Sequence, residues 1–247
     1  MDAGTAYFES WVEAVDLDRG SALPGWTGRH VAAHVAANAR ALGRLAHWAR
    51  TGEERPMYAS PQARDAEIEE LAGRLSGAEL AGLVKETAVE LRADLWRLSE
   101  AQWEARVRTA QGRVVPATEI VWMRTREVWV HGVDLGGRFE DLPGELVDAL
   151  VGDVVGLWRM RGQGPAMVLT ATDRATDRAT DSEAGGQAVW RVPAPAEAPP
   201  SAGSGPVRAP EADAVPEVRG TAAELAAWLT GRGSAPAPGA PAIGRWL

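Results

Sequence analysis

The sequence has 247 residues, 45% of them apolar, and a formal net charge of −8 at neutral pH. This length suits two domains with a proper core, and the negative charge argues against nucleic acid or an anionic membrane surface as the main partner. The apolar runs are short and interrupted, so no segment is predicted to span a bilayer, and the first ten residues lack the features of a secretion signal. We therefore expect a cytoplasmic protein.

The chain contains no cysteine. This excludes disulfides, thiolate metal sites and cysteine nucleophiles, so any thiol chemistry requires a thiol from outside the chain. Lys85 is the only lysine, so almost all basic residues are arginine, and alanine, glycine and proline are abundant. Such a bias is typical of a high-GC genome such as that of an actinomycete.

The N-terminal part of the chain has the periodicity of amphipathic helices. Apolar residues recur at spacings of three and four over residues 2–16. Thr27 is a plausible N-cap for a long helix that ends at Thr51-Gly52, and a helix pair is predicted over 61–75 and 77–99.

A short extended segment interrupts this helical pattern. Residues 103–116 alternate around Gln111-Gly112 and predict a hairpin or an extended loop. Pro116 is then expected to open a helix over 117–135, and a further helix is expected from Gly144 to about Arg161.

From residue 162 the composition changes. Segments 165–172 and 187–193 are predicted strands, and the four-residue repeat at 171–181 between them is expected to be a solvated hairpin tip. A Pro-, Ala- and Gly-rich loop at 193–214 precedes a strand, a turn and a helix within 215–233. The sequence therefore predicts a mainly helical α+β protein, with a helical bundle over 1–160 and a smaller α+β domain over 161–247.

Three residues on two predicted helices form a candidate metal site. Glu127 and His131 are four residues apart and share a helix face, and His34 lies on an apolar face of the long helix. Two histidines and one carboxylate suit a divalent transition metal and leave coordination positions open, as a catalytic site requires. A buried Glu127 also needs a partner, since an unpaired buried carboxylate is costly.

Each of these residues has an alternative interpretation. A lone histidine on an apolar face is often a buried core residue, and a Glu-x-x-x-His pair is often a surface salt bridge. His30 lies four residues before His34 and offers a rival ligand pair, whereas His47 lies near the helix end and is expected to be solvated.

Three segments carry a resemblance to a known family. GWTGRHVAAHVAANARALGRL and MRTREVWVHGVDL resemble the Trp-Thr…His and Arg-Glu-x-x-x-His-x-x-Asp helices of the mycothiol-dependent maleylpyruvate isomerases. VRGTAAELAAWLTGRG resembles part of that family's second domain. The resemblance implies a DinB-like four-helix bundle followed by a small α+β domain.

The resemblance also implies site residues. The family's zinc ligands correspond to His34, Glu127 and His131, and its active-site arginine corresponds best to Arg232. His30 stands where an acidic residue is common in the family, and the 171–181 repeat is a local expansion. Substrate identity is therefore less constrained than the metal site.

The implied reaction uses zinc and mycothiol, a small external thiol. The thiolate adds to an electron-poor double bond, and rotation followed by loss of the thiol isomerises the substrate, whose carboxylate Arg232 would hold. The expected partners are a small-molecule thiol and an electrophilic carboxylate, and the protein is expected to be a monomer.

The sequence leaves three alternatives to an isomerase open. Without loss of the thiol, the same site would be a mycothiol S-transferase. A zinc hydrolase would want a carboxylate base, for which Asp134 is available, although Asp134 also suits a role as hydrogen-bond partner of a ligand histidine. The third alternative is a non-catalytic metal-binding protein.

Overall fold

The computed structural model describes residues 1–176, 186–193, 215–244 and 246, and the chain divides into two units, Met1–Arg138 and Phe139–Leu247. Among the described helices, none has the length and hydropathy that a membrane span requires. The two units are considered one at a time.

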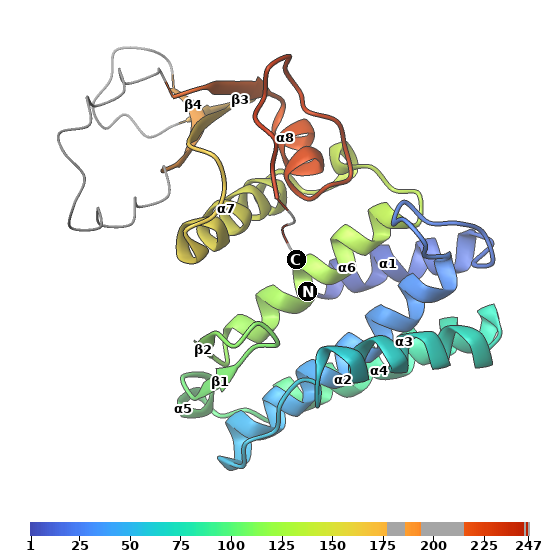
Figure 1. Cartoon of the computed structure of the whole chain (residues 1–247). Helices are drawn as coiled ribbons and strands as arrows, with labels where there is room; N and C mark the ends of the chain where they lie inside the picture. Colours follow the sequence, from blue (N-terminus) through green and yellow to red (C-terminus); the bar gives the residue numbers. More distant parts are fainter. Residues whose placement is uncertain (177–185, 194–214, 245, 247) are drawn as a thin grey trace, which may run out of the picture. The chain divides into compact units, whose positions relative to one another are not determined.

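The first unit is a four-helix bundle (Figure 1). Helix α1 packs against α4 and α6, and α2 packs against the same two helices, so the four enclose a common core; α3 packs against α2. This agrees with the predicted fold class. The helix bounds are α1 Asp2–Ala14, α2 Gly28–Thr51, α3 Pro61–Arg74, α4 Gly77–Trp96, α5 Glu100–Trp103 and α6 Glu119–Asp134.

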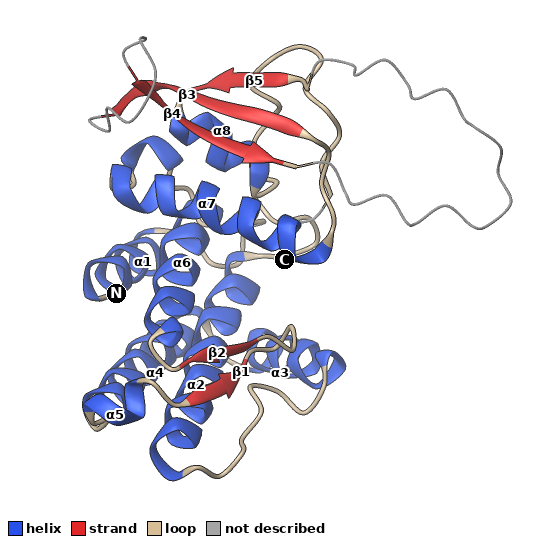
Figure 2. Cartoon of the chain, turned by 90° about the vertical axis from the view of Figure 1, so that its left-hand side faces the viewer, coloured by secondary structure: helices blue, strands red, loops and turns tan. Residues whose placement is uncertain are grey.

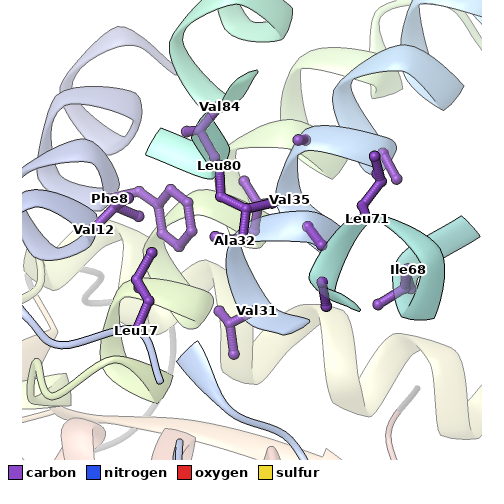
Figure 3. Packing of buried hydrophobic residues seen from close by; sticks show 14 of the residues in the cluster. Phe8, Val12, Leu17, Val31, Ala32, Val35, Ile68, Leu71, Leu80 and Val84 are labelled. Atoms are coloured by element: carbon purple, nitrogen blue, oxygen red, sulfur yellow. The ribbon is translucent and has the colours of Figure 1, made fainter. Parts of the chain in front are cut away.

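Helix α2 lies at the centre of this unit, and small side chains dominate its buried surface. Its buried positions are mostly alanine and valine, whose small side chains allow neighbouring helices to approach closely. The predicted N-cap Thr27 donates its backbone N–H to His30 Nδ1 at 3.2 Å, and Gly52 ends the helix with a φ of 77°. Figure 3 shows the core around it; the labelled side chains include Phe8, Val12, Val31, Val35, Leu80 and Val84.

Two glycines allow α1 and α6 to pack closely. A Cβ at Gly132 of α6 would lie 2.3 Å from the ring of Tyr7 in α1. A Cβ at Gly4 of α1 would lie 2.6 Å from the indole nitrogen of Trp129 in α6. Both distances are far inside van der Waals contact, so the seam between α1 and α6 depends on these two residues having no side chain.

The extended segment before α6 forms the predicted hairpin. Strand β1 (Arg106–Arg108) pairs antiparallel with β2 (Val114–Pro116). The prediction that Pro116 opens the next helix is wrong. Pro116 pairs opposite Arg106 in the hairpin, and α6 begins at Glu119. The reason is that the pairing continues past β2, with Ala117 donating its N–H to the Ala105 carbonyl at 2.9 Å.

The second unit is a three-stranded sheet with two helices on one face (Figure 2). The central strand β3 runs antiparallel to β4 and parallel to β5. Helix α7 packs against α8 and β4, and α8 also packs against β3. The bounds are η1 Phe139–Asp141, α7 Gly144–Arg161, β3 Met167–Thr176, β4 Gly186–Val192, β5 Glu217–Gly220 and α8 Ala222–Leu229.

Helix α7 has the predicted bounds but belongs to the second unit. The sequence predicts a first domain over residues 1–160, which would include α7, whereas the boundary between the two units follows Arg138. The physical reason is its packing, since the apolar face of α7 is covered by α8 and β4.

The repeat and the Pro-rich loop are only partly described. Strand β3 continues through Thr176, so it includes the first part of the 171–181 repeat. The rest of the repeat and residues 194–214 lie outside the described residues. Helix α8 follows its predicted N-cap: Glu224 N–H donates to Thr221 Oγ1 at 3.2 Å.

Candidate metal centre

His34, Glu127 and His131 converge where α2 packs against α6. His34 Nε2 donates to Glu127 Oε2 at 2.9 Å, and His131 Nε2 lies 3.3 Å from the same oxygen. One ligand atom from each residue lies within 4.8 Å of the other two. The side chains of all three residues are at most 12% exposed, so the polar atoms meet in a largely dry environment.

The spacing of these atoms fits a zinc ion. Tetrahedral ligands at about 2.0–2.1 Å from zinc lie roughly 3.3 Å from one another. The distances from His34 Nε2 and His131 Nε2 to Glu127 Oε2 are close to this value. The ligand atoms of the two histidines lie within 4.8 Å of each other. Two imidazoles and one carboxylate are also a donor set typical of catalytic zinc, which keeps a further position for water or substrate.

Asp134 holds the imidazole ring of one ligand candidate in a fixed orientation. His131 Nδ1 donates to Asp134 Oδ2 at 2.7 Å, and the Asp134 side chain is 0% exposed. When the ring is neutral, its proton is on Nδ1, so the lone pair of Nε2 faces the Glu127 carboxylate. A cation bound between them would remove the resulting electrostatic repulsion. The geometry matches a partner of a ligand histidine and leaves this carboxylate poorly placed to act as a hydrolytic base.

The pKa values of the three ligand candidates differ from the usual values of these side chains. Burial raises the pKa of Glu127, but hydrogen bonds from His131 and His34 outweigh it and hold that pKa well below its usual value. Burial lowers the pKa of His34. The pKa of His131 is raised, because its bonds to Asp134 and Glu127 outweigh the effect of burial. An anionic Glu127 beside a neutral His34 is the form in which these groups bind a cation.

Comparison with known proteins identifies the family. Residues 1–136 match the model of the mycothiol maleylpyruvate isomerase N-terminal domain. A crystal structure of a mycothiol-dependent maleylpyruvate isomerase is 35% identical, with a TM-score of 0.76, over 94% of this chain and 86% of that one. This chain belongs to the mycothiol-dependent maleylpyruvate isomerase family.

A second solved structure supports the same assignment. It is a histidine-to-alanine variant of a mycothiol-dependent maleylpyruvate isomerase, with 34% identity, a TM-score of 0.75 and the same coverage. No curated protein sequence matches the chain. The family model spans all three ligand candidates and Asp134, and the structural likeness extends across most of both units.

The other two histidines of the chain lie near glutamates outside the cluster. His30 Nε2 lies 3.4 Å from Glu69 Oε2 of α3, and His47 Nε2 lies 3.6 Å from Glu53 Oε2. Neither joins the cluster of three ligand candidates, which is the cluster found within the described part of the chain. The structure therefore does not bring His30 or His47 into the metal centre.

Arg232 lies in the second unit, just after α8. Its Nη1 donates to the Thr230 carbonyl at 2.7 Å, as a residue capping a helix C-terminus does. Its role at the site thus remains a prediction from the family resemblance.

The structure adds a buried arginine that the sequence analysis overlooked. Arg124 is 1% exposed, and its Nη1 donates to the Val35 carbonyl at 2.7 Å and to Asn38 Oδ1 at 3.2 Å. It therefore links α6 to α2 beside His34, and burial lowers its pKa to about 10. The available signal was its position three residues before Glu127, on the same helical stripe.

Proposed function

We propose that this protein is a zinc- and mycothiol-dependent cis–trans isomerase of the maleylpyruvate type. The observation that carries the proposal is the convergence of His34, Glu127 and His131 within 4.8 Å in a chain of this family. These residues would hold the zinc ion, and Asp134 would hold His131 in the orientation that binding requires. A bound zinc ion lowers the pKa of a thiol ligand, so that thiolate is available at neutral pH.

The reaction conserves atoms and electrons. The sulfur of the external thiolate forms a bond to the electron-poor carbon of the substrate, and the π electrons move onto the conjugated carbonyl. Rotation about the resulting single bond changes the geometry. When the electrons return, the C–S bond breaks and the double bond re-forms as the other isomer, with the thiol released unchanged. Because the chain has no cysteine, the sulfur must come from the cosubstrate.

The remaining roles belong to the chain's own residues. The apolar residues around the cluster keep bulk water away from the reacting sulfur, which strengthens every electrostatic interaction there. Arg232 would grip a carboxylate of the substrate with its planar guanidinium. We also propose that the protein acts in the cytoplasm as a monomer.

Thiol dependence tests this function. Zinc-reconstituted protein should isomerise maleylpyruvate only when mycothiol is added, and elemental analysis should find one zinc per chain. His34→Ala should lose both zinc and activity, whereas the matched control His47→Ala on the same helix should keep both. Equal rates with and without thiol would contradict the proposal, and accumulation of a stable thioether would indicate S-conjugation instead.

A further inference from the structure

The two histidines of the candidate metal centre are held in different ways. The His131 ring is fixed by the hydrogen bond from its Nδ1 to Asp134. The His34 ring has its Nε2 beside Glu127, but its Nδ1 is buried and has no hydrogen-bond partner within the described part of the chain. A histidine that binds a metal through one ring nitrogen almost always donates the other to an acceptor, which sets the angle of the ring. A different kind of contact is therefore expected to orient the His34 ring.

The indole of Trp26 makes such a contact. Its ring centre lies 5.6 Å from that of His34, with an angle of 56° between the ring planes. This distance is within the range of interacting aromatic pairs, which gain stability beyond the burial of their surface. The His34 ring also meets the His131 ring edge-on, with 4.7 Å between the ring centres. Of these two aromatic contacts, that of Trp26 comes from a residue outside the set of ligand candidates.

The backbone around Trp26 is anchored on both sides of the residue. Its N–H donates to the Leu23 carbonyl at 3.1 Å, and its carbonyl accepts from the Ser21 N–H at 2.9 Å and from the Ser21 hydroxyl at 3.0 Å. The adjacent Ala22 donates its N–H to the Asp134 carbonyl at 3.0 Å, which ties this loop to the end of α6. The indole itself packs against the apolar core around α2. These contacts give Trp26 the fixed base that a positioning residue needs.

His30 supports the indole from the same helix that carries His34. The ring centres of Trp26 and His30 are 6.2 Å apart, and the ring planes are 27° from parallel. His30 Nδ1 accepts the Thr27 N–H at 3.2 Å, and His30 Nε2 lies 3.4 Å from Glu69 Oε2. A ring with a partner at both nitrogens offers the indole a stable neighbour.

We propose that Trp26 is a positioning residue of the metal centre, whose indole holds the His34 imidazole in the orientation that zinc binding requires. Asp134 does this for His131 through a hydrogen bond, whereas Trp26 does it for His34 through ring packing. His30 braces the indole and is not a ligand. The inference rests on the proposed function in one respect, because it takes the three ligand candidates as the zinc site.

Zinc affinity, measured without thiol or substrate, tests this inference. Trp26→Leu keeps an apolar side chain but removes the aromatic face, so zinc should bind about tenfold more weakly in competition with a chelator. Trp26→Phe keeps a ring and should stay within about threefold of the wild-type affinity. Trp11→Leu is the matched control, because Trp11 is also half-buried against the same core and its ring neighbour is Tyr7. The control should bind zinc as the wild type does.

A second measurement separates positioning from a general loss of packing. The absorption spectrum of the cobalt(II)-substituted protein reports the geometry of the metal ligands. Trp26→Leu should change this spectrum and His30→Ala should change it less, whereas Trp11→Leu should leave it as in the wild type. The free energy of unfolding of the metal-free protein should fall in both leucine variants, because each removes a half-buried indole. If Trp26→Leu does not fold, Trp26→Met takes its place in both measurements.

The outcomes separate this inference from the proposed function. Equal zinc affinity in Trp26→Leu and the wild type would overturn the inference, as would equal weakening in Trp26→Leu and Trp11→Leu. A wild-type protein that binds zinc but does not isomerise maleylpyruvate contradicts the proposed function alone, and the Trp26 variants still decide this inference. A wild-type protein that binds no zinc overturns both.

Discussion

The two units of this protein differ in the kind of polar group that they bury. Among the described residues, the buried ionisable side chains belong to the first unit: His34, Arg124, Arg126 and Asp134. The buried polar side chains of the second unit are Thr170 and Thr230. Their hydroxyls donate to Glu217 Oε1 and to the Ala226 carbonyl, each at 2.7 Å.

This difference indicates where the chemistry resides. A buried hydroxyl that has a hydrogen-bond partner costs little, whereas a buried charge costs several kcal/mol unless it is paired or bound to a metal. In the first unit, the buried ionisable side chains gather where α2 packs against α6, within the residues that match the family model. The described core of the second unit is apolar apart from these two threonines. Any catalytic residue of this unit is therefore expected on its surface.

The largest expected effect is loss of a metal ligand. Glu127→Ala should reduce zinc content from one per chain to near zero, because two histidines hold zinc poorly. The loss of kcat/KM should exceed the roughly 100-fold that removal of a ligand's hydrogen-bond partner causes. Elemental analysis and kinetics measure both, with the exposed Glu86→Ala in α4 as control. Stoichiometric zinc in Glu127→Ala would show that the chemistry of the first unit does not depend on this cluster.

Asp134 should have the next largest effect. Asp134→Ala removes the acceptor for His131 Nδ1 and should weaken zinc binding by about 10–100-fold, measured by competition with a chelator. Asp134→Asn keeps an oxygen that accepts the same hydrogen bond, so most of the affinity should return. If the two variants bind zinc equally weakly, then the negative charge of Asp134 matters and its orientation of His131 does not.

Arg232 tests whether the second unit contributes to catalysis. If it grips a substrate carboxylate, Arg232→Ala should lower kcat/KM by about tenfold while folding and zinc content stay unchanged. Arg219→Ala, which removes an exposed arginine of β5 paired with Glu217, is the matched control. If Arg232 only caps α8, the variant should lose about 0.3–1 kcal/mol of stability with its kinetics intact.

The smallest effects come from two capping boxes, one in each unit. Ser76 caps α4 and Thr221 caps α8, and each exchanges hydrogen bonds with a glutamate three residues later. Ser76→Ala and Thr221→Ala should each lower the free energy of unfolding by about 1 kcal/mol. In urea unfolding, zinc should stabilise the transition that Ser76→Ala shifts and leave the other in place, because the ligands all lie in the first unit. A single transition shifted equally by both variants would show that the units unfold together.

Much of the fold follows from local signals in the sequence. Thr27 and Gly52 flank α2 because a threonine N-cap and a left-handed glycine are strong end signals, and the periodicity of α7 gives its bounds. The grouping of His34, Glu127 and His131 follows from helix geometry together with the cost of burying a carboxylate among apolar neighbours. The pairing of Glu127 with His131 requires no knowledge of which helices pack together, whereas the addition of His34 assumes that the two helices meet.

The features that the sequence analysis did not predict depend on tertiary packing. The periodicity of α7 is the same whichever core covers it, so the end of the first unit at Arg138 was not evident. Arg124 looks like a surface residue until the Val35 carbonyl is seen to accept its hydrogen bond.

The glycine seam between α1 and α6 has a consequence for how this protein diverges. Gly132 directly follows His131, so any side chain there would push against Tyr7 and displace the helix that carries two of the three ligand candidates. Such a variant would keep every ligand in its sequence and still lose the metal, so a survey of ligand residues alone would count it as active.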